Sequence, residues 1–327
     1  MAACMLVGIL TTLIIREPDR RVSNEVVETN ADYLRFLLMF VIAVAGFVSC
    51  FYFSSDVAKS ARSVLSEIFA NKHLAGFFIE CLRLATAIGV AWILVLGLIK
   101  AELVRAEMVE RSYLMPVRDF FQRYGLTLAW LLLALVGLYR ISDIVLGVIS
   151  NVFYYDLGYS KAEIGQAVWV FGVIMTILGG LIGGLLSMRF GVMRILFLGA
   201  LLSAATNLLF MILASVGYDM LWLYIVISAD NLSAGLASAA FVAFLSSLTN
   251  VSFTATQYAI FSSLMTLLPK ILGGYSGTMV DAIGYSNFFF LTALMGVPVL
   301  LLIAVAARRS EFSFKLSTTE TAAQETA

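Results

Sequence analysis

The sequence is poor in the residues on which most enzymes and metalloproteins depend. It holds one histidine, His73, and three cysteines, Cys4, Cys50 and Cys81, in 327 residues. One histidine excludes a histidine-based metal cluster, and the cysteines lie in apolar runs, which favours small buried hydrophobes over a disulfide framework. Nucleophile elbows, phosphate-binding loops and metal-ligand spacings are also missing. We therefore expect no catalytic residue, no metal and no cofactor in this chain.

Charge is scarce as well. Charged residues make up 13% of the chain, about half of the roughly 25% that is typical of soluble domains. Hydrophobic residues make up 61%, the mean hydropathy is +0.97 and the net charge is zero. A neutral chain offers no bulk attraction for nucleic acid. The composition predicts an all-α integral membrane protein whose main partner is the lipid bilayer.

Long apolar runs of about 20 residues predict the spans. Eight of them lie at about 34–53, 76–99, 126–150, 164–187, 192–215, 220–247, 256–280 and 287–307. A ninth apolar segment begins at Met1 and ends at Arg16, and it reaches only about 22 Å at 1.5 Å per residue. No basic residue precedes it, so we interpret residues 1–17 as the end of a transmembrane helix rather than as a signal peptide.

Basic residues set the expected orientation. With Arg16 in the cytoplasm, the inner loops carry thirteen Lys and Arg residues and the outer loops carry four, which is the asymmetry of the positive-inside rule. Residues 126–309 then form a unit of six spans, and residues 18–125 form cytoplasmic linkers around two extra transmembrane helices. We expect a cytoplasmic surface helix over 100–123 and a disordered cytoplasmic tail over 310–327.

Four charged side chains interrupt the spans. They are Arg140, Asp143, Asp230 (followed by Asn231) and Lys270. A charge at the bilayer centre costs about 2.5–3.5 kcal/mol on insertion scales, and such residues commonly mark transport pathways. Arg140 and Asp143 are three residues apart and can pair on one helix face, so a structural ion pair is the alternative.

These groups suit two kinds of chemistry. A carboxylate in a low-dielectric cavity takes up a proton more readily than one in water, which permits proton coupling. Arg140 and Lys270 can instead hold an anionic substrate. Both alternatives remain open from the sequence.

Small residues predict close helix packing. Gly179, Gly180 and Gly183 form small-xxx-small pairs together with Gly184, and Gly273 and Gly277 repeat the spacing. Static packing and helices that slide during transport both account for these glycines.

One short connection resembles a loop of the major facilitator superfamily, which has the form G-x-x-x-D-R-x-G-x-x-R. Gly184, Arg189, Gly191 and Arg194 match it at fixed spacing, whereas Met188 stands where an aspartate is usual. An ordinary basic cytoplasmic turn is the alternative interpretation.

A second resemblance covers residues 112–307, and more loosely 1–18. The chain resembles the AmpG family of muropeptide permeases, and the motifs that carry the resemblance are Met115-Pro116-Val117-Arg118-Asp119, Leu138-Tyr139-Arg140, Asp230-Asn231, Phe241-Val242-Ala243, Leu248-Thr249-Asn250 and Thr254-Ala255-Thr256-Gln257-Tyr258-Ala259.

The resemblance implies the second six-helix half of a major facilitator fold with two extra helices between the halves. It implies proton-coupled import of anhydro-muropeptides across the bacterial inner membrane for cell-wall recycling. Arg140, Asp143, Asp230, Asn231 and Lys270 become candidate pathway residues. A facilitator needs two halves, so the sequence is similar to an N-terminally truncated permease with a separately encoded first half as a partner. Alternatives are a carrier of another anion, such as acetyl-CoA, and an inactive membrane protein.

Overall fold

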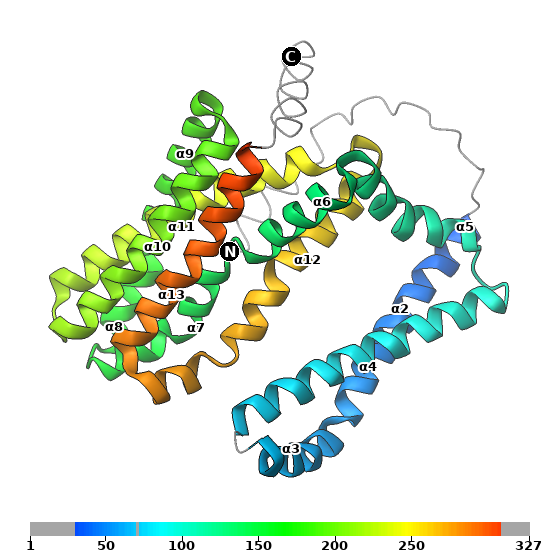
Figure 1. Ribbon diagram of the computed structural model, residues 1–327, viewed down its shortest axis with the longest axis horizontal. Helices are drawn as coiled ribbons and strands as arrows, with labels where there is room; N and C mark the ends of the chain where they lie inside the picture. The colour runs from blue at the N-terminus through cyan, green and yellow to red at the C-terminus, as the bar shows by residue number, and fades with distance from the viewer. Residues whose placement is uncertain (1–29, 70–71, 309–327) are drawn as a thin grey trace. The chain divides into compact units, whose positions relative to one another are not determined.

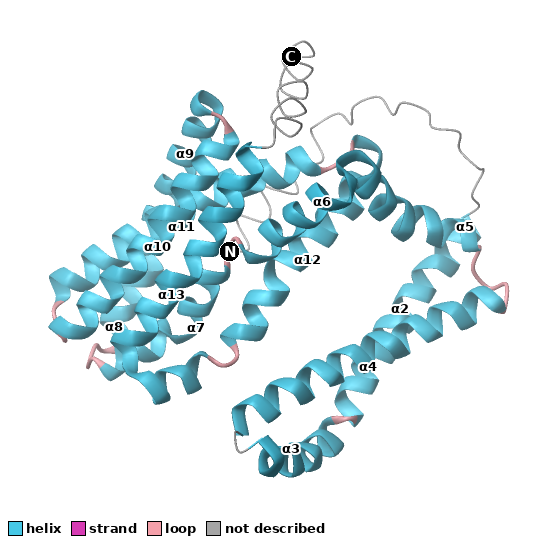
Figure 2. Ribbon diagram, viewed as in Figure 1, coloured by secondary structure: helices cyan, strands magenta, loops and turns pink. Residues whose placement is uncertain are grey.

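The computed structural model describes residues 30–69 and 72–308. Over these residues the backbone is helical with short connections and contains no strand (Figure 2). The all-α expectation is therefore confirmed. Eight helical segments are long and apolar enough to cross a membrane, so this is a multi-pass membrane protein. The expected segment at residues 1–17, including Cys4, and the expected tail at 310–327 lie outside the described residues.

The chain divides into two compact units, one before and one after residue 109. Within the described part of the first unit, the long helices are α2 (Asn30–Phe53), α3 (Ser55–Phe69) and α4 (Lys72–Lys100). α2 and α4 lie side by side and cross closely at Gly46, where an added Cβ would meet Leu94 Cδ1 at 2.2 Å. Most of their apolar side chains are exposed, as is expected of helices that face lipid.

Arg83 is a charged residue within an apolar helix of the first unit, and it has several partners there. Its guanidinium donates to Glu80, to Ser54 Oγ and, at 2.6 Å, to the carbonyl of Phe51. It also lies 4.1 Å from the centre of the Phe51 ring. Because Phe51 lies in the last turn of α2, Arg83 caps that helix and is itself fully partnered.

The described part of the second unit holds six helical segments that are long and apolar enough to cross a membrane. Its elements are α6 (Met115–Leu138), α7 (Ile141–Asp156), α8 (Lys161–Ile164), the π-helical η2 (Gly165–Gly172), α9 (Val173–Phe190), α10 (Val192–Val216), α11 (Met220–Leu248), the 3-10 turn η3 (Val251–Phe253), α12 (Thr254–Gly273) and α13 (Ser276–Arg308). Before them, α5 (Ala106–Val109) and the π-helical η1 (Glu110–Leu114) cover part of the expected surface helix.

Helix packing in this unit follows a simple pattern (Figure 1). α11 packs against α9 on one side and α10 on the other, and α10 packs in turn against α13. α12 packs against α6 and α7. The packed faces bury a continuous apolar core, in which Phe153, Phe210 and Phe289 contact one another with ring centroids 4.7–6.4 Å apart.

Two expected spans differ from the observed helices. The expected span at 126–150 begins in a helix that is kinked at Gly125, is interrupted at Tyr139 and Arg140, and continues to Asp156. The expected span at 256–280 ends earlier, because α12 stops at Gly273 and α13 begins at Ser276. Hydropathy reports apolar composition and does not register such breaks, since the flanking residues are apolar on both sides.

Some glycines carry the packing that their spacing predicts. An added Cβ on Gly179 would meet the carbonyl oxygen of Leu232 at 2.1 Å, and one on Gly183 would meet that of Leu236 at 2.7 Å. These two glycines therefore let α9 and α11 approach backbone to backbone. An added Cβ on Gly273 would lie 3.1 Å from Val148 Cγ2 on α7, whereas one on Gly184 would meet nothing within 4 Å. Gly180 and Gly277 have only ordinary or marginal contacts, at 3.9 and 4.0 Å.

Candidate functional site

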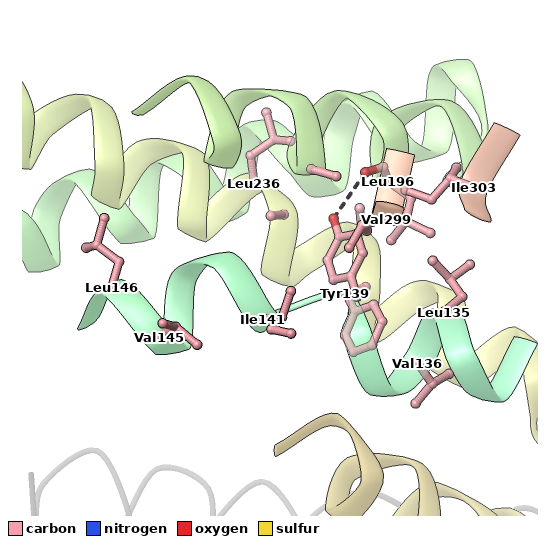
Figure 3. Close-up of a cluster of buried hydrophobic side chains, with 14 of the residues drawn as sticks. Leu135, Val136, Tyr139, Ile141, Val145, Leu146, Leu196, Leu236, Val299 and Ile303 are labelled. Carbon is pink, nitrogen blue, oxygen red and sulfur yellow. Dashed lines mark hydrogen bonds between the residues drawn. The ribbon is translucent and has the colours of Figure 1, made fainter. Parts of the chain in front are cut away.

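The interruption between α6 and α7 creates the centre of the candidate site. Arg140 precedes α7 with φ −95° and ψ 11°, outside helical geometry. Tyr139 lies in this break, and its ring stacks on that of Phe241 with the centroids 4.5 Å apart. Its hydroxyl donates to the carbonyl of Leu196 at 3.1 Å (Figure 3). Broken helices at membrane depth are typical of transporter binding sites.

Arg140 and Asp143 form an ion pair, with Arg140 Nε 3.2 Å from Asp143 Oδ2. Their side chains are 23% and 14% exposed, so solvent screening of the pair is limited. Each partner has a further contact on a neighbouring helix. Arg140 donates to Ser238 Oγ on α11, and Asp143 accepts from Ser203 Oγ on α10. The pair that the spacing predicts is therefore present and connects three helices.

Asp230 lies on α11 and faces α10. Its Oδ1 accepts from Thr206 Oγ1 at 3.4 Å, and its carboxylate is within electrostatic range of Asp143 and Arg140. Asn231 has a different neighbour, because its Oδ1 accepts from Thr176 on α9 at 3.0 Å. The two adjacent residues therefore connect α11 to the helices on its opposite sides.

Lys270 is separate from this cluster. It lies in the last turn of α12, is exposed, and forms no ion pair with any residue in the described ranges. A cation in the last turn interacts favourably with the helix dipole, and a long lysine side chain near a helix end can extend to the membrane surface. Because Lys270 is exposed near a helix end, its charge does not require a buried partner. A hydropathy profile does not reveal this helix end.

α10 supplies residues that the sequence analysis did not single out. Besides Ser203 and Thr206, Asn207 donates to Ser142 Oγ at 2.7 Å, and Ser142 donates to the carbonyl of Thr292 on α13 at 2.8 Å. Asn207 is 1% exposed. The available signal was the polar triplet formed at 203, 206 and 207 in an otherwise apolar span, since residues three or four apart share a helix face.

A second polar cluster lies near the start of α6 and at the connection between α11 and α12. It joins Asp119 and Arg123 of α6 to Asn250 and Gln257 at the connection between α11 and α12. Arg123 also donates to the carbonyl of Leu248, which caps the end of α11. Asp119, Asn250 and Gln257 belong to the motifs of the AmpG resemblance, although the sequence did not show that these motifs meet.

The expected inter-helix loop is a single-residue connection. α9 ends at Phe190 and α10 begins at Val192, and Gly191 between them has φ 87°, a conformation that favours glycine. Arg189 and Arg194 are exposed, and Arg189 lies 5.5 Å from the Phe190 ring centre. The backbone conformation at position 191 thus explains the glycine of this motif. Arg189 and Arg194 give the helix pair an exposed basic end.

Beyond these clusters, a cavity of about 520 Å³ is lined by Arg111, Ser112 and residues 251–256. Within the described ranges, no group of three His, Cys, Asp or Glu residues could hold a metal ion. Cys50 and Cys81 are free thiols.

Comparison with known proteins identifies relatives of this sequence. It is 36% identical over 209 residues to an uncharacterized protein of Haemophilus influenzae, covering 62% of this chain and 49% of that protein. It is 34% identical over 197 residues to the putative transporter AmpG 1 of Rickettsia prowazekii, covering 59% and 44%. It is 32% identical over 206 residues to the anhydromuropeptide permease of Escherichia coli K12, covering 63% and 41%. No family model matches the chain.

The chain spans about half the length of the curated relatives it matches. Those with an assigned role are named as permeases or transporters, which agrees with the expectation that the chain is not an enzyme. The motif resemblance and these alignments point to the same proteins. Over about three fifths of its length, this multi-pass membrane protein is a homologue of the AmpG permeases.

Proposed function

We propose that the chain takes part in proton-coupled import of peptidoglycan-derived anhydro-muropeptides across the bacterial inner membrane, in the service of cell-wall recycling. The observation that carries this proposal is the cluster of Arg140, Asp143 and Asp230 at the break between α6 and α7. An enclosed set of ionisable groups in the membrane-spanning part of a permease homologue is the arrangement that ion-coupled transport requires.

The energetics are sufficient for uptake. One elementary charge that crosses 100 mV releases about 2.3 kcal/mol, which supports roughly forty-fold accumulation of a neutral substrate. A site that binds a proton from one side and releases it on the other converts this energy into substrate movement. The candidate pathway residues are Arg140, Asp143, Asp230, Asn231 and Lys270.

Residues 126–309 act as the second six-helix half of a major facilitator in this proposal. Major facilitators bind substrate between two six-helix halves. A first half, on the same or a separate polypeptide, completes the cavity. α2 and α4 are the extra pair of helices, inserted before this half.

Uptake of radiolabelled anhydro-muropeptide into membrane vesicles tests the proposal. The chain is expressed together with a first six-helix half, right-side-out vesicles are the test, and inverted vesicles are the control. We expect accumulation in right-side-out vesicles that a protonophore abolishes. Radiolabelled acetyl-CoA serves as the competing substrate. Accumulation of acetyl-CoA without accumulation of muropeptide would assign the chain to the other class of carrier, and protonophore-insensitive uptake would remove proton coupling.

A further inference from the structure

The two acids of the site, both partly buried, have unlike surroundings. Asp143 has a compensating cation, with Arg140 Nε at 3.2 Å, and also accepts a hydrogen bond from Ser203. Both of its carboxylate oxygens are therefore engaged, one by the guanidinium and one by the hydroxyl. Asp143 therefore has both a compensating charge and a hydrogen bond within the site.

Asp230 has no comparable partner. Among the described residues, no Lys or Arg lies within 4.0 Å of its carboxylate. Its one hydrogen bond, from Thr206 Oγ1, is 3.4 Å long, which exceeds the usual range for a hydroxyl donor. Thr206 also donates to the carbonyl of Ser203 at 2.9 Å, so its proton is shared and Asp230 receives the weaker share.

The other charged groups near α11 do not compensate Asp230. Arg189, Arg194 and Lys270 lie in the last or first turns of α9, α10 and α12, the helices packed against α11. The ionisable groups that act electrostatically on Asp230 are Asp143 and Arg140, which already form a pair, and the buried phenol of Tyr154 on α7. The net field at Asp230 thus comes from an almost neutral ion pair.

We infer that Asp230 is the group that carries the coupling proton, and that Asp143 and Arg140 remain a closed ion pair. The assignment rests on the proposed proton-coupled transport and names the acid on which it depends. A proton from water adds to one carboxylate oxygen of Asp230 and gives a neutral carboxyl; release returns the carboxylate and the proton. Asp230 as a whole is partly exposed.

Infrared spectroscopy of the purified chain in nanodiscs tests the assignment without any transport assay. A protonated carboxyl has a carbonyl stretch that shifts in D2O and is absent from a carboxylate. We expect this band at neutral pH, its loss in Asp230→Asn, and its persistence in the double variant Asp143→Asn with Arg140→Gln, which removes the ion pair without leaving Arg140 free to compensate Asp230. Asp219→Asn is the matched control, because Asp219 caps the start of α11 outside the cluster.

A companion measurement guards against variants that fail to fold. Replacing a neutral carboxyl by an amide leaves the charge unchanged, so Asp230→Asn should unfold at the wild-type temperature. Asp143→Asn leaves Arg140 unpaired and should unfold at a lower temperature, and the double change Asp143→Asn with Arg140→Gln should recover part of the loss and retain the band. The inference is overturned if the band survives Asp230→Asn or disappears in the double variant.

These outcomes are separable from failure of the proposed function. If the infrared assignment holds but vesicles show no proton-dependent uptake, the titrating acid stands and the transport proposal falls. If uptake is proton-dependent but the band belongs to Asp143, the transport proposal stands and this inference falls.

Discussion

The side-chain amide of Gln257 donates to Asp119 Oδ2 at 2.9 Å, although 138 residues separate them in the sequence. The same amide nitrogen donates to the carbonyl of Pro116 at 2.8 Å. Its oxygen accepts from the Asn250 backbone at 2.7 Å and from Arg123 at 3.2 Å. Gln257 is 1% exposed, so one buried side chain with all four hydrogen bonds made joins α6 to the α11–α12 connection.

Replacing Gln257 by leucine should therefore destabilise the second unit. The change leaves Asn250 N–H and the Pro116 carbonyl without these partners, and each unsatisfied buried group costs about 1–3 kcal/mol. We expect the free energy of unfolding to fall by about 3 kcal/mol, measured by denaturation in mixed micelles. The matched control is Gln122→Leu on the exposed face of α6, the helix that Gln257 contacts. Equal stability of both variants would contradict the structural role of Gln257.

Gly179→Ala should disrupt the contact between α9 and α11. Its new Cβ would lie 2.1 Å from the Leu232 carbonyl oxygen, so one backbone must move. Overpacking of this kind costs about 2 kcal/mol. Gly184→Ala, where the Cβ meets nothing within 4 Å, is the control and should be as stable as the wild type or slightly more stable, because alanine favours a helix interior over glycine. A similar loss in both variants would contradict the role of close approach at Gly179.

Gly125→Ala and Gly89→Ala should change stability in opposite directions. An added Cβ meets nothing within 4 Å at either position, but Gly125 has φ 70°. A left-handed conformation costs an L-residue about 1 kcal/mol. Alanine at Gly89, in the interior of α4, should instead stabilise by about 0.5–1 kcal/mol. Thermal unfolding of the two variants checks this difference in sign, and destabilisation by both would refute it.

The Arg140 and Asp143 ion pair can be measured by a double-mutant cycle. Asp143→Asn or Arg140→Gln alone leaves one partner uncompensated in the membrane interior, which should cost about 3 kcal/mol. The double variant should cost less than the sum of the single changes, because no charge is left unpaired. Additive losses would mean that the two side chains contribute separately, through Ser238 and Ser203.

The sequence predicted the span order and the spacing of the pair on α7 because both follow from local rules. Apolar runs reveal helices, and residues three apart share a helix face. Lys270 illustrates the limit. In the sequence it lies within an apolar run, yet α12 ends three residues later at Gly273. Helix ends in apolar sequence depend on tertiary packing, which a hydropathy window averages away.

Local pattern alone determined that this chain is helical, membrane-spanning and marked by paired charges. Tertiary structure decided which of those charges meet. Arg140 and Asp143 are joined by helical spacing, whereas Ser203, Ser238 and Thr206 reach the site from α10 and α11 through packing between helices. Contacts between distant segments arise from three-dimensional packing of side chains. The residue order within one helix therefore does not predict which other helix packs against it.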